Sequence, residues 1–198
     1  MKSNNSEKLL LISRYNLDLV RQIINNQHSN NKKVYCDFFN GNLEIFLMNK
    51  KTKNKIDYGF IFEDLSDVSL EFKNALMGKK VDFIKFKEEI KTYLRLINLA
   101  KKNFSTIFMS NFEIYEKSNL LNIFTHYQKI NGAAYLINAA NNMISDFINE
   151  SNNLIMINNT HFSNVSMNYT NYYTAKFPLM IDSLKKWVPI TFDAFMDY

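Results

Sequence analysis

The stretch Leu9-Leu10-Leu11-Ile12-Ser13 decides the fold of this chain. Its consecutive aliphatic residues predict a strand over 8–12 that is buried on both faces, as in the interior of a parallel sheet. A helical pattern over 17–26 follows at once, with Asn16 as a suitable N-cap. Open parallel sheets bind their ligands beyond the carboxyl ends of the strands. Ser13 therefore stands where chemistry is expected.

Four further strand-like runs alternate with helical patterns along the chain. Strands joined by helices form right-handed crossovers in a parallel sheet. The pattern therefore predicts one three-layer α/β/α domain over residues 1–198, with a flavodoxin-like parallel sheet of five strands. The expected strands are 33–36, 56–62, 104–110 and 154–157. Between them we expect a turn at 38–42, a short helix from 43, a loop or short helix over 64–77, helices over 83–102 and 131–149, and a last helix beyond Pro178.

The composition restricts the class of protein. The chain has 198 residues, 46% of them apolar, and only 4 Gly and 2 Pro, which fits one helix-rich domain. The single Cys36 excludes an internal disulfide and indicates a reducing compartment. No segment resembles a signal peptide or approaches the ~20 apolar residues of a membrane span. We therefore expect a cytoplasmic protein without a membrane span.

The lysines are dispersed. They gather at 50–55, at Lys79-Lys80 and at Lys101-Lys102, each at an expected helix end or loop, within a modest net charge of +5. A nucleic-acid-binding protein collects its cations on one face. The clusters are therefore interpreted as solvated surface lysines, and no nucleic acid is expected as a partner.

Five stretches carry a resemblance to a known family. They are 11–17, Phe38-Phe39-Asn40-Gly41, Glu63-Asp64-Leu65, the helix over 133–147, and Tyr172-Tyr173-Thr174-Ala175-Lys176-Phe177-Pro178. On these residues the chain resembles the SGNH hydrolase-like amino-terminal domain of FkbH-like proteins, which a HAD-type phosphatase-like domain follows. The most specific match is 172–178. The HAD motif Asp-x-Asp-x-Thr does not occur in the sequence, so we expect either a lone domain or one half of a longer protein.

The resemblance implies a function. FkbH-like proteins load a glycerate-derived three-carbon unit onto an acyl carrier protein, or act in related surface-polysaccharide pathways, and this chemistry belongs to the HAD-type domain. The present chain is then expected to be an accessory SGNH-like domain that docks an acyl carrier protein or a HAD-type partner. No cofactor is expected.

The alternative is an active SGNH esterase or acyltransferase. The family pattern requires a serine nucleophile after the first strand, a glycine amide after the second and an asparagine after the third, the last two for the oxyanion. Ser13 fits the first place and Gly41 the second. Glu63 and Asp64 stand at the third, and ionised carboxylates there would repel an oxyanion. Ser13 is also explained as a cap of the following helix.

The triad base is the weakest part of that alternative. Asn168 and Asn171 hold the spacing of the family's Asp-x-x-His pair, and neither acts as a base. His161 is the remaining candidate base, with Asp64 or Glu63 as its orienter, and the competing interpretation is a surface histidine. Because loss of a triad base costs several orders of magnitude in rate, we expect a non-hydrolytic domain.

A candidate ligand cleft remains at the carboxyl ends of the strands. Lys176 either meets a phosphate or carboxylate there or extends into solvent. The aromatic residues around it either form a recognition surface or pack the last helix on the sheet. No metal site is expected, because the three histidines are widely spaced and the carboxylates are not paired. The cleft residues are Ser13, Gly41, Glu63, Asp64, Asn168, Asn171 and Lys176.

Overall fold

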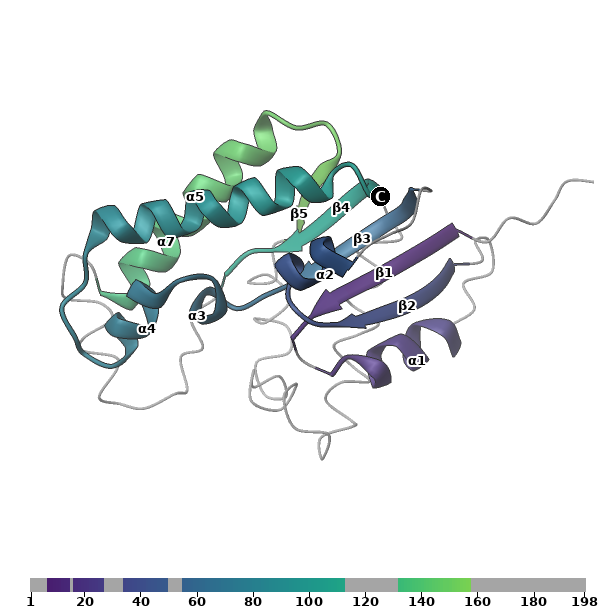
Figure 1. The fold of residues 1–198 in the computed structure, drawn as a ribbon, viewed down its shortest axis with the longest axis horizontal. Helices are drawn as coiled ribbons and strands as arrows, with labels where there is room; N and C mark the ends of the chain where they lie inside the picture. Colours follow the sequence, from purple (N-terminus) through teal and green to yellow (C-terminus); the bar gives the residue numbers. More distant parts are fainter. Residues whose placement is uncertain (1–6, 15, 27–33, 50–54, 113–131, 158–198) are drawn as a thin grey trace, which may run out of the picture.

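The structure, a computed structural model, describes residues 7–14, 16–26, 34–49, 55–112 and 132–157. In this part of the chain five strands form one sheet (Figure 1). The neighbouring strands are all parallel, and their order is β2-β1-β3-β4-β5. This order confirms the predicted flavodoxin-like α/β class. The strands are β1 (Glu7–Ser13), β2 (Val34–Asn40), β3 (Ile56–Phe62), β4 (Phe104–Ser110) and β5 (Leu154–Ile157).

Helices cover both faces of the sheet, which gives three layers (Figure 1). Side chains alternate along β1, so that Leu9 and Leu11 pack with α1 while Ile12 joins the core on the opposite face. Among the described helices, none is long and apolar enough to cross a membrane. The helices are α1 (Asp18–Asn26), α2 (Leu43–Asn49), α3 (Leu65–Val68), α4 (Leu70–Leu76), α5 (Phe83–Ala100) and α7 (Ala133–Asn149).

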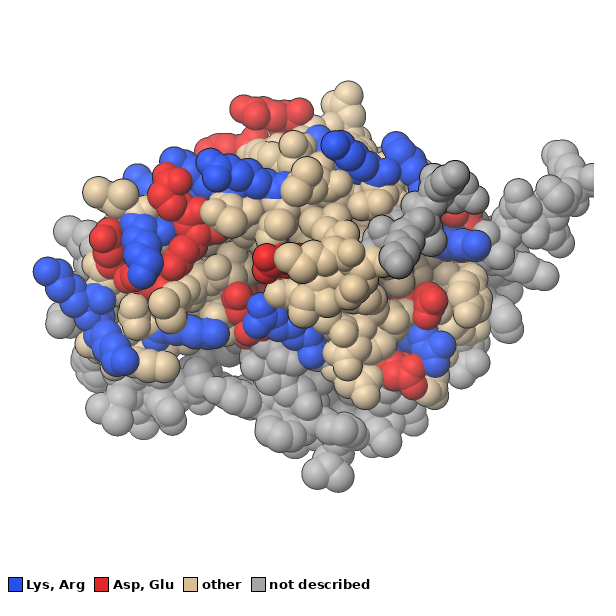
Figure 2. All heavy atoms as spheres, in the orientation of Figure 1, with Lys and Arg blue, Asp and Glu red and all other residues tan. Residues whose placement is uncertain are grey.

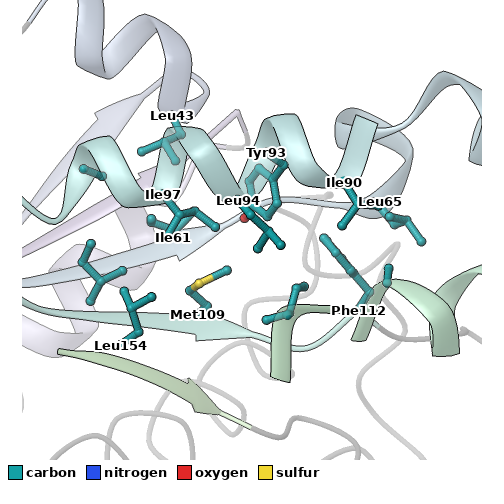
Figure 3. Packing of buried hydrophobic residues seen from close by; sticks show 14 of the residues in the cluster. Leu43, Ile61, Leu65, Ile90, Tyr93, Leu94, Ile97, Met109, Phe112 and Leu154 are labelled. Carbon is teal, nitrogen blue, oxygen red and sulfur yellow. The ribbon is translucent and has the colours of Figure 1, made fainter. Parts of the chain in front are cut away.

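The larger core lies between the sheet and the layer of α2, α5 and α7 (Figure 3). Apolar residues of α5 recur at three- and four-residue spacing and face this core, as the sequence pattern predicts. Asp82 begins α5, because its side chain accepts hydrogen bonds from the Ile84 and Lys85 N–H groups. Ile90 and Ile97 are completely buried. The long helix is therefore fixed by its own amphipathic pattern.

The end of β2 corrects one prediction. A turn was expected at 38–42, but β2 continues through Asn40, so that prediction is wrong for 38–40. Phe38 packs on the α1 side of the sheet and Phe39 on the other side, and this alternation extends the strand. Ser13 is likewise the last residue of β1 and lies within the strand. The remaining described elements agree with the predicted ones to within a helical turn, and 64–77 forms the two helices α3 and α4.

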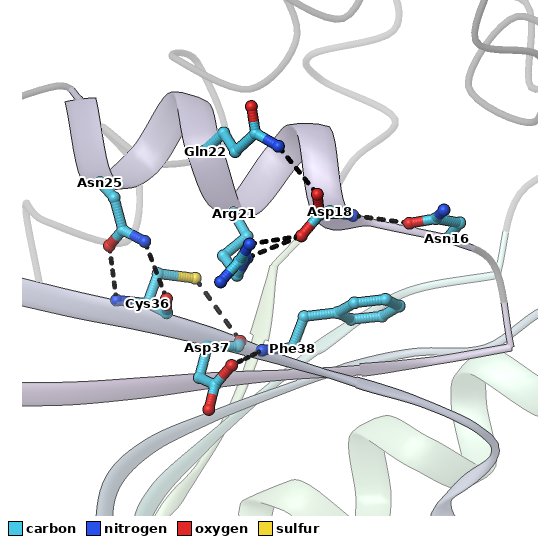
Figure 4. A network of polar contacts seen from close by, with 8 residues as sticks. All are labelled: Asn16, Asp18, Arg21, Gln22, Asn25, Cys36, Asp37 and Phe38. Atoms are coloured by element: carbon cyan, nitrogen blue, oxygen red, sulfur yellow. Dashed lines mark hydrogen bonds and ion pairs between the residues drawn. The ribbon is translucent and has the colours of Figure 1, made fainter.

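The outer edge of β2 is covered by side-chain hydrogen bonds (Figure 4). Asn25 of α1 accepts from the Cys36 N–H at 2.8 Å and donates to the Cys36 carbonyl at 2.9 Å. The Asp37 carboxylate accepts from the Phe38 N–H at 2.8 Å. Backbone groups of an edge strand otherwise offer a template for pairing with another chain. These contacts dock α1 on the sheet and occupy backbone groups at its edge.

Cys36 is a buried, inert thiol. Burial, together with the neighbouring charge of Asp37, raises the pKa of Cys36 to about 12. The thiolate is the nucleophilic form of cysteine, and a thiol with this pKa stays protonated at neutral pH. Cys36 therefore contributes packing and not reactivity.

We predict that Asn25→Ala lowers the free energy of unfolding by about 1–3 kcal/mol, because the Cys36 N–H and carbonyl lose their partners. Urea unfolding followed by circular dichroism measures the change. The control is Gln22→Ala on the exposed side of the same helix, with an expected change below about 0.5 kcal/mol. An Asn25→Ala chain as stable as its parent would show that water replaces the amide at no cost.

Candidate functional site at the carboxyl edge of the sheet

The carboxyl ends of β1, β2 and β3 bring four of the predicted site residues to one edge. Ser13 is in register with Asn40 of β2 and with Phe62 of β3, so Gly41 and Glu63 follow on either side of it. β2 lies on one side of β1 and the later strands on the other, which makes this edge the switch point of the sheet. Ligands of doubly wound sheets bind at such a point. Asp64 follows directly and belongs to the same edge.

Ser13 is closed off from solvent. Its exposed fraction is 0%, although it is the last residue of β1. Alternation along the strand places it on the side of Leu9 and Leu11, which face α1. A serine nucleophile has to be reached by its substrate. In this conformation Ser13 is packed within the domain and is not presented to a substrate.

The Gly41 amide is committed to the sheet. Its N–H donates to the Ser13 carbonyl oxygen at 2.8 Å and so extends the ladder between β1 and β2. An oxyanion donor has to point instead at the position where the negative oxygen forms. A Cβ on Gly41 would lie 2.7 Å from Cε1 of the Phe39 ring. A larger residue at this position would require the Phe39 ring to shift, so the glycine also has a packing role.

Glu63 caps the start of α2, although it lies 20 residues after Leu43 in the sequence. Its Oε1 accepts a hydrogen bond from the Leu43 N–H at 2.8 Å, and the Asn42 side chain accepts from the Ile45 N–H at 2.9 Å. The first N–H groups of a helix have no partner within the helix, so these contacts satisfy two of them. Glu63, which follows the third strand, therefore acts as a cap of α2.

The charge state of Glu63 reflects opposing effects. Burial raises the pKa of Glu63, whereas the Leu43 N–H and the charge of Arg14 lower it, and the charge of Asp67 raises it further. Burial is the largest of these effects, so the pKa lies above its usual value. The hydrogen bond with the Leu43 N–H gives this carboxylate a structural role at the start of α2.

The ion pair between Arg14 and Asp67 is a contact at this edge that the sequence did not predict. Arg14 Nη1 lies 3.5 Å from Asp67 Oδ1, with the arginine side chain 43% exposed. The pair links the end of β1 to α3, although an exposed ion pair of this kind contributes little stability. Arg14 directly follows Ser13 in the sequence, but no local pattern pairs it with a residue so far along the chain.

Asn141 fixes the backbone just after the carboxyl end of β4 by two hydrogen bonds. Asn141 of α7 accepts from the Phe112 N–H and donates to the Phe112 carbonyl, both at 2.8 Å. The Phe112 ring lies 6.2 Å from that of Tyr93 on α5. Burial, and to a lesser degree the charge of Glu63, raise the pKa of Tyr93 well above its usual value, so its phenol stays protonated. At the end of β4 the contacts of Asn141, Phe112 and Tyr93 therefore serve the packing of α5 and α7 on the sheet.

The remaining predicted site residues lie outside the described part of the chain. They are His161, Asn168, Asn171 and Lys176. Their roles as base, spacing equivalents of the Asp-x-x-His pair and anion contact stay predictions. Within the residues that the structure does describe, no group of three or more His, Cys, Asp or Glu side chains could hold a metal ion.

We predict opposite effects for two substitutions of Glu63. Glu63→Gln keeps an oxygen acceptor for the Leu43 N–H, whereas Glu63→Ala leaves that buried group unsatisfied and costs about 1–2 kcal/mol. Because the folded-state pKa of Glu63 is raised, its ionisation costs stability as the pH rises above the usual value of 4.5. Relative to its parent, Glu63→Gln should therefore gain stability as the pH increases from about 4 to about 7.

Urea unfolding at both pH values measures these changes. A Glu63→Gln chain that loses stability relative to its parent over this range would contradict the raised pKa. Equal stabilities of the Gln and Ala variants would contradict the capping role.

Comparison with known proteins adds a likeness at the level of the fold. No family model matches the chain, and no curated protein does. The present chain is similar to a crystal structure of the N-terminal part of a Bacteroides fragilis protein, a part that contains a phosphatase domain and is complexed with magnesium. The TM-score is 0.64 and the sequence identity is 14%. The likeness covers 93% of this chain and 50% of that one, so the present chain spans half the length of the matched chain. At this identity the two share a fold, and the present chain resembles in fold a part of a phosphatase-domain-containing protein.

Proposed function

We propose that this chain is a non-hydrolytic SGNH-like accessory domain of an FkbH-like glyceryl-transfer or surface-polysaccharide system. In this role it docks an acyl carrier protein or a HAD-type phosphatase-like partner. The group-transfer chemistry then resides in the partner. The chain contributes a rigid α/β platform and presents its surface to the other components.

This proposal rests on the structural roles of Ser13, Gly41 and Glu63. Ser13 is buried, the Gly41 amide donates to the Ser13 carbonyl, and Glu63 caps α2. A working triad needs an accessible hydroxyl, a base and free oxyanion donors at the same place. Among the described candidates, the Ser13 side chain is buried, and the Gly41 amide and the Glu63 carboxylate are engaged in holding the fold. This arrangement supports an accessory role over hydrolysis.

The fold comparison supports the association with a phosphatase-like domain. The matched Bacteroides fragilis chain contains a phosphatase domain, and the present chain spans half of its length. A resemblance in fold does not by itself transfer function. It agrees, however, with the family that the motifs at 11–17 and 172–178 resemble.

The alternative, an esterase or acyltransferase with Ser13 as nucleophile and His161 as base, rests on the position of Ser13 at the switch point. We predict that the wild-type chain hydrolyses p-nitrophenyl acetate no faster than its Ser13→Ala variant. Absorbance of the released nitrophenolate measures the rate. Ser105→Ala, which alters an exposed serine of β4, is the matched control. Turnover that disappears in Ser13→Ala and persists in Ser105→Ala would establish the esterase.

The association with a HAD-type partner predicts that the same genome encodes this partner close to the present chain. We expect an Asp-x-Asp-x-Thr motif after a strand-like run, either downstream in the same reading frame or in an adjacent gene. If the two domains are separate proteins, co-expression with one affinity tag should recover both. A genome that holds no such neighbour, together with failure to co-purify any HAD-type protein of that genome, would contradict this part of the proposal.

A further inference from the structure

The strand β2 forms an outer edge of the sheet, and its sequence is well suited to pairing with a further strand. Among the described strands, β2 has β1 as a neighbour on one side and none on the other. In the run Val34-Tyr35-Cys36-Asp37-Phe38-Phe39 every residue except Asp37 is apolar, and Tyr35 is 52% exposed. A short apolar run of high β-propensity at a sheet edge is a template for association between chains.

Every second residue of β2 turns its backbone N–H and carbonyl away from β1. The Gly41 N–H donates to the Ser13 carbonyl and therefore faces β1. Backbone groups point to alternate sides along a strand, so the groups of Phe39, Asp37 and Tyr35 face β1 as well. A further strand at this edge would have to pair with the outward groups of the remaining residues. These are Val34, Cys36, Phe38 and Asn40.

Side chains of the same domain occupy the central outward groups (Figure 4). Asn25, near the end of α1, binds both the N–H and the carbonyl of Cys36, at 2.8 Å and 2.9 Å. Asp37 Oδ1 accepts from the Phe38 N–H at 2.8 Å. Pairing with another strand requires successive outward groups that are open to hydrogen bonding. Because Cys36 and Phe38 lie in the middle of β2, these contacts interrupt the edge at its centre.

A second copy of β2 would meet this block at its own centre as well. In the antiparallel register that pairs the whole strand, Val34 lies opposite Asn40 of the other copy, and Asp37 lies opposite its own equivalent. Cys36 and Phe38 then form the two central hydrogen-bonded pairs. In each of these pairs the N–H and carbonyl of Cys36 and the N–H of Phe38 are already engaged. The register therefore requires that bonds within the domain break first.

Asp37 also opposes this register through its charge. At the centre it would form a pair without backbone hydrogen bonds, in which the Cα atoms of the two copies are only about 4.5 Å apart. Like charges directly opposite each other destabilise a pair of strands. The Asp37 carboxylate thus acts twice, as the acceptor of the Phe38 N–H and as a charge that repels its equivalent in a second copy.

We propose that Asn25 and Asp37 keep β2 from pairing with a second copy of this chain. A second copy always carries the same strand, and a two-fold axis makes each contact between the strands form twice. Natural sheets protect exposed edges with charges or with elements that cover them. Here an asparagine of α1 and an aspartate of the strand share that role. This protection does not depend on the proposed function.

Sedimentation velocity of the parent chain and of Asn25→Ala/Asp37→Val, over about 5 to 500 μM, tests the proposal. The double variant frees the outward groups of Cys36 and Phe38 and removes the charge at the centre of the edge. Valine favours a strand, so β2 should be retained. We expect the variant to associate at least about tenfold more tightly than its parent, because each interstrand hydrogen bond gained forms twice.

The matched control is Asn141→Ala. Asn141 binds both backbone groups of Phe112 in the same manner, but Phe112 follows β4, which lies between β3 and β5 in the sheet. The control therefore loses two hydrogen bonds of the same kind without opening a sheet edge. Its self-association should stay within about twofold of that of the parent. An equal increase in the control and in the double variant would show that lost stability drives association, and would overturn the proposal.

A single substitution guards against loss of the fold in the double variant. Asp37→Val leaves both Asn25 contacts in place and should tighten self-association about threefold. Circular dichroism and urea unfolding verify that each variant is folded. Hydrogen exchange locates the contact, because the amides of residues 34–40 should exchange more slowly in the dimer than in the monomer. Folded variants that associate no more than their parent, or a dimer that protects a different segment instead, would sink the proposal.

Discussion

The fold depends on the pairing of β1 on both of its sides. Seven residues of β1 are in register with β2, and five of them also with β3, while the side chains alternate between two cores. The aliphatic run that ends at Ser13 makes this possible, because such a strand is stable only when both faces are covered. The final bond of the ladder joins the Gly41 N–H to the Ser13 carbonyl. The same contact that completes the sheet therefore occupies the amide an oxyanion would need.

The sequence was informative wherever a single element decides its own structure. The strands β3, β4 and β5 begin and end as their patterns indicate, and α5 follows its apolar periodicity. The topology also brings Ser13, Gly41 and Glu63 together, because parallel strands end at one edge. The contacts of Glu63 with Leu43, of Arg14 with Asp67 and of Asn25 with Cys36 could not be predicted. Each joins residues far apart in the sequence, and only the packing of complete elements selects the partner. The end of β2 was misjudged for a related reason, since Asn40-Gly41-Asn42 is a strong turn signal that the two preceding phenylalanines delay.

Polar side chains at the ends of parallel strands have two competing uses. They can serve a ligand, or they can satisfy backbone groups that the sheet and helix ends leave unpaired. In this domain Asn25 and Asn141 each bind both backbone groups of one residue, and Glu63 caps a helix. An unsatisfied buried N–H costs about 1–3 kcal/mol, which is a large fraction of the stability of a small domain. Such residues are therefore retained for folding whether or not the domain catalyses a reaction.

The charged residues at the carboxyl edge of the sheet have the same structural use. At the switch point Arg14 pairs with Asp67, and its charge also lowers the pKa of Glu63, although burial keeps that pKa above its usual value. Between α4 and α5, Glu89 accepts from the Ser69 hydroxyl and the Glu71 N–H, while Glu71 accepts from the Asp82 N–H and pairs with Lys85. Compensated charges hold a fold together, whereas uncompensated charges steer an encounter. Arg14 and these carboxylates belong to the first kind, because each has a partner within the domain.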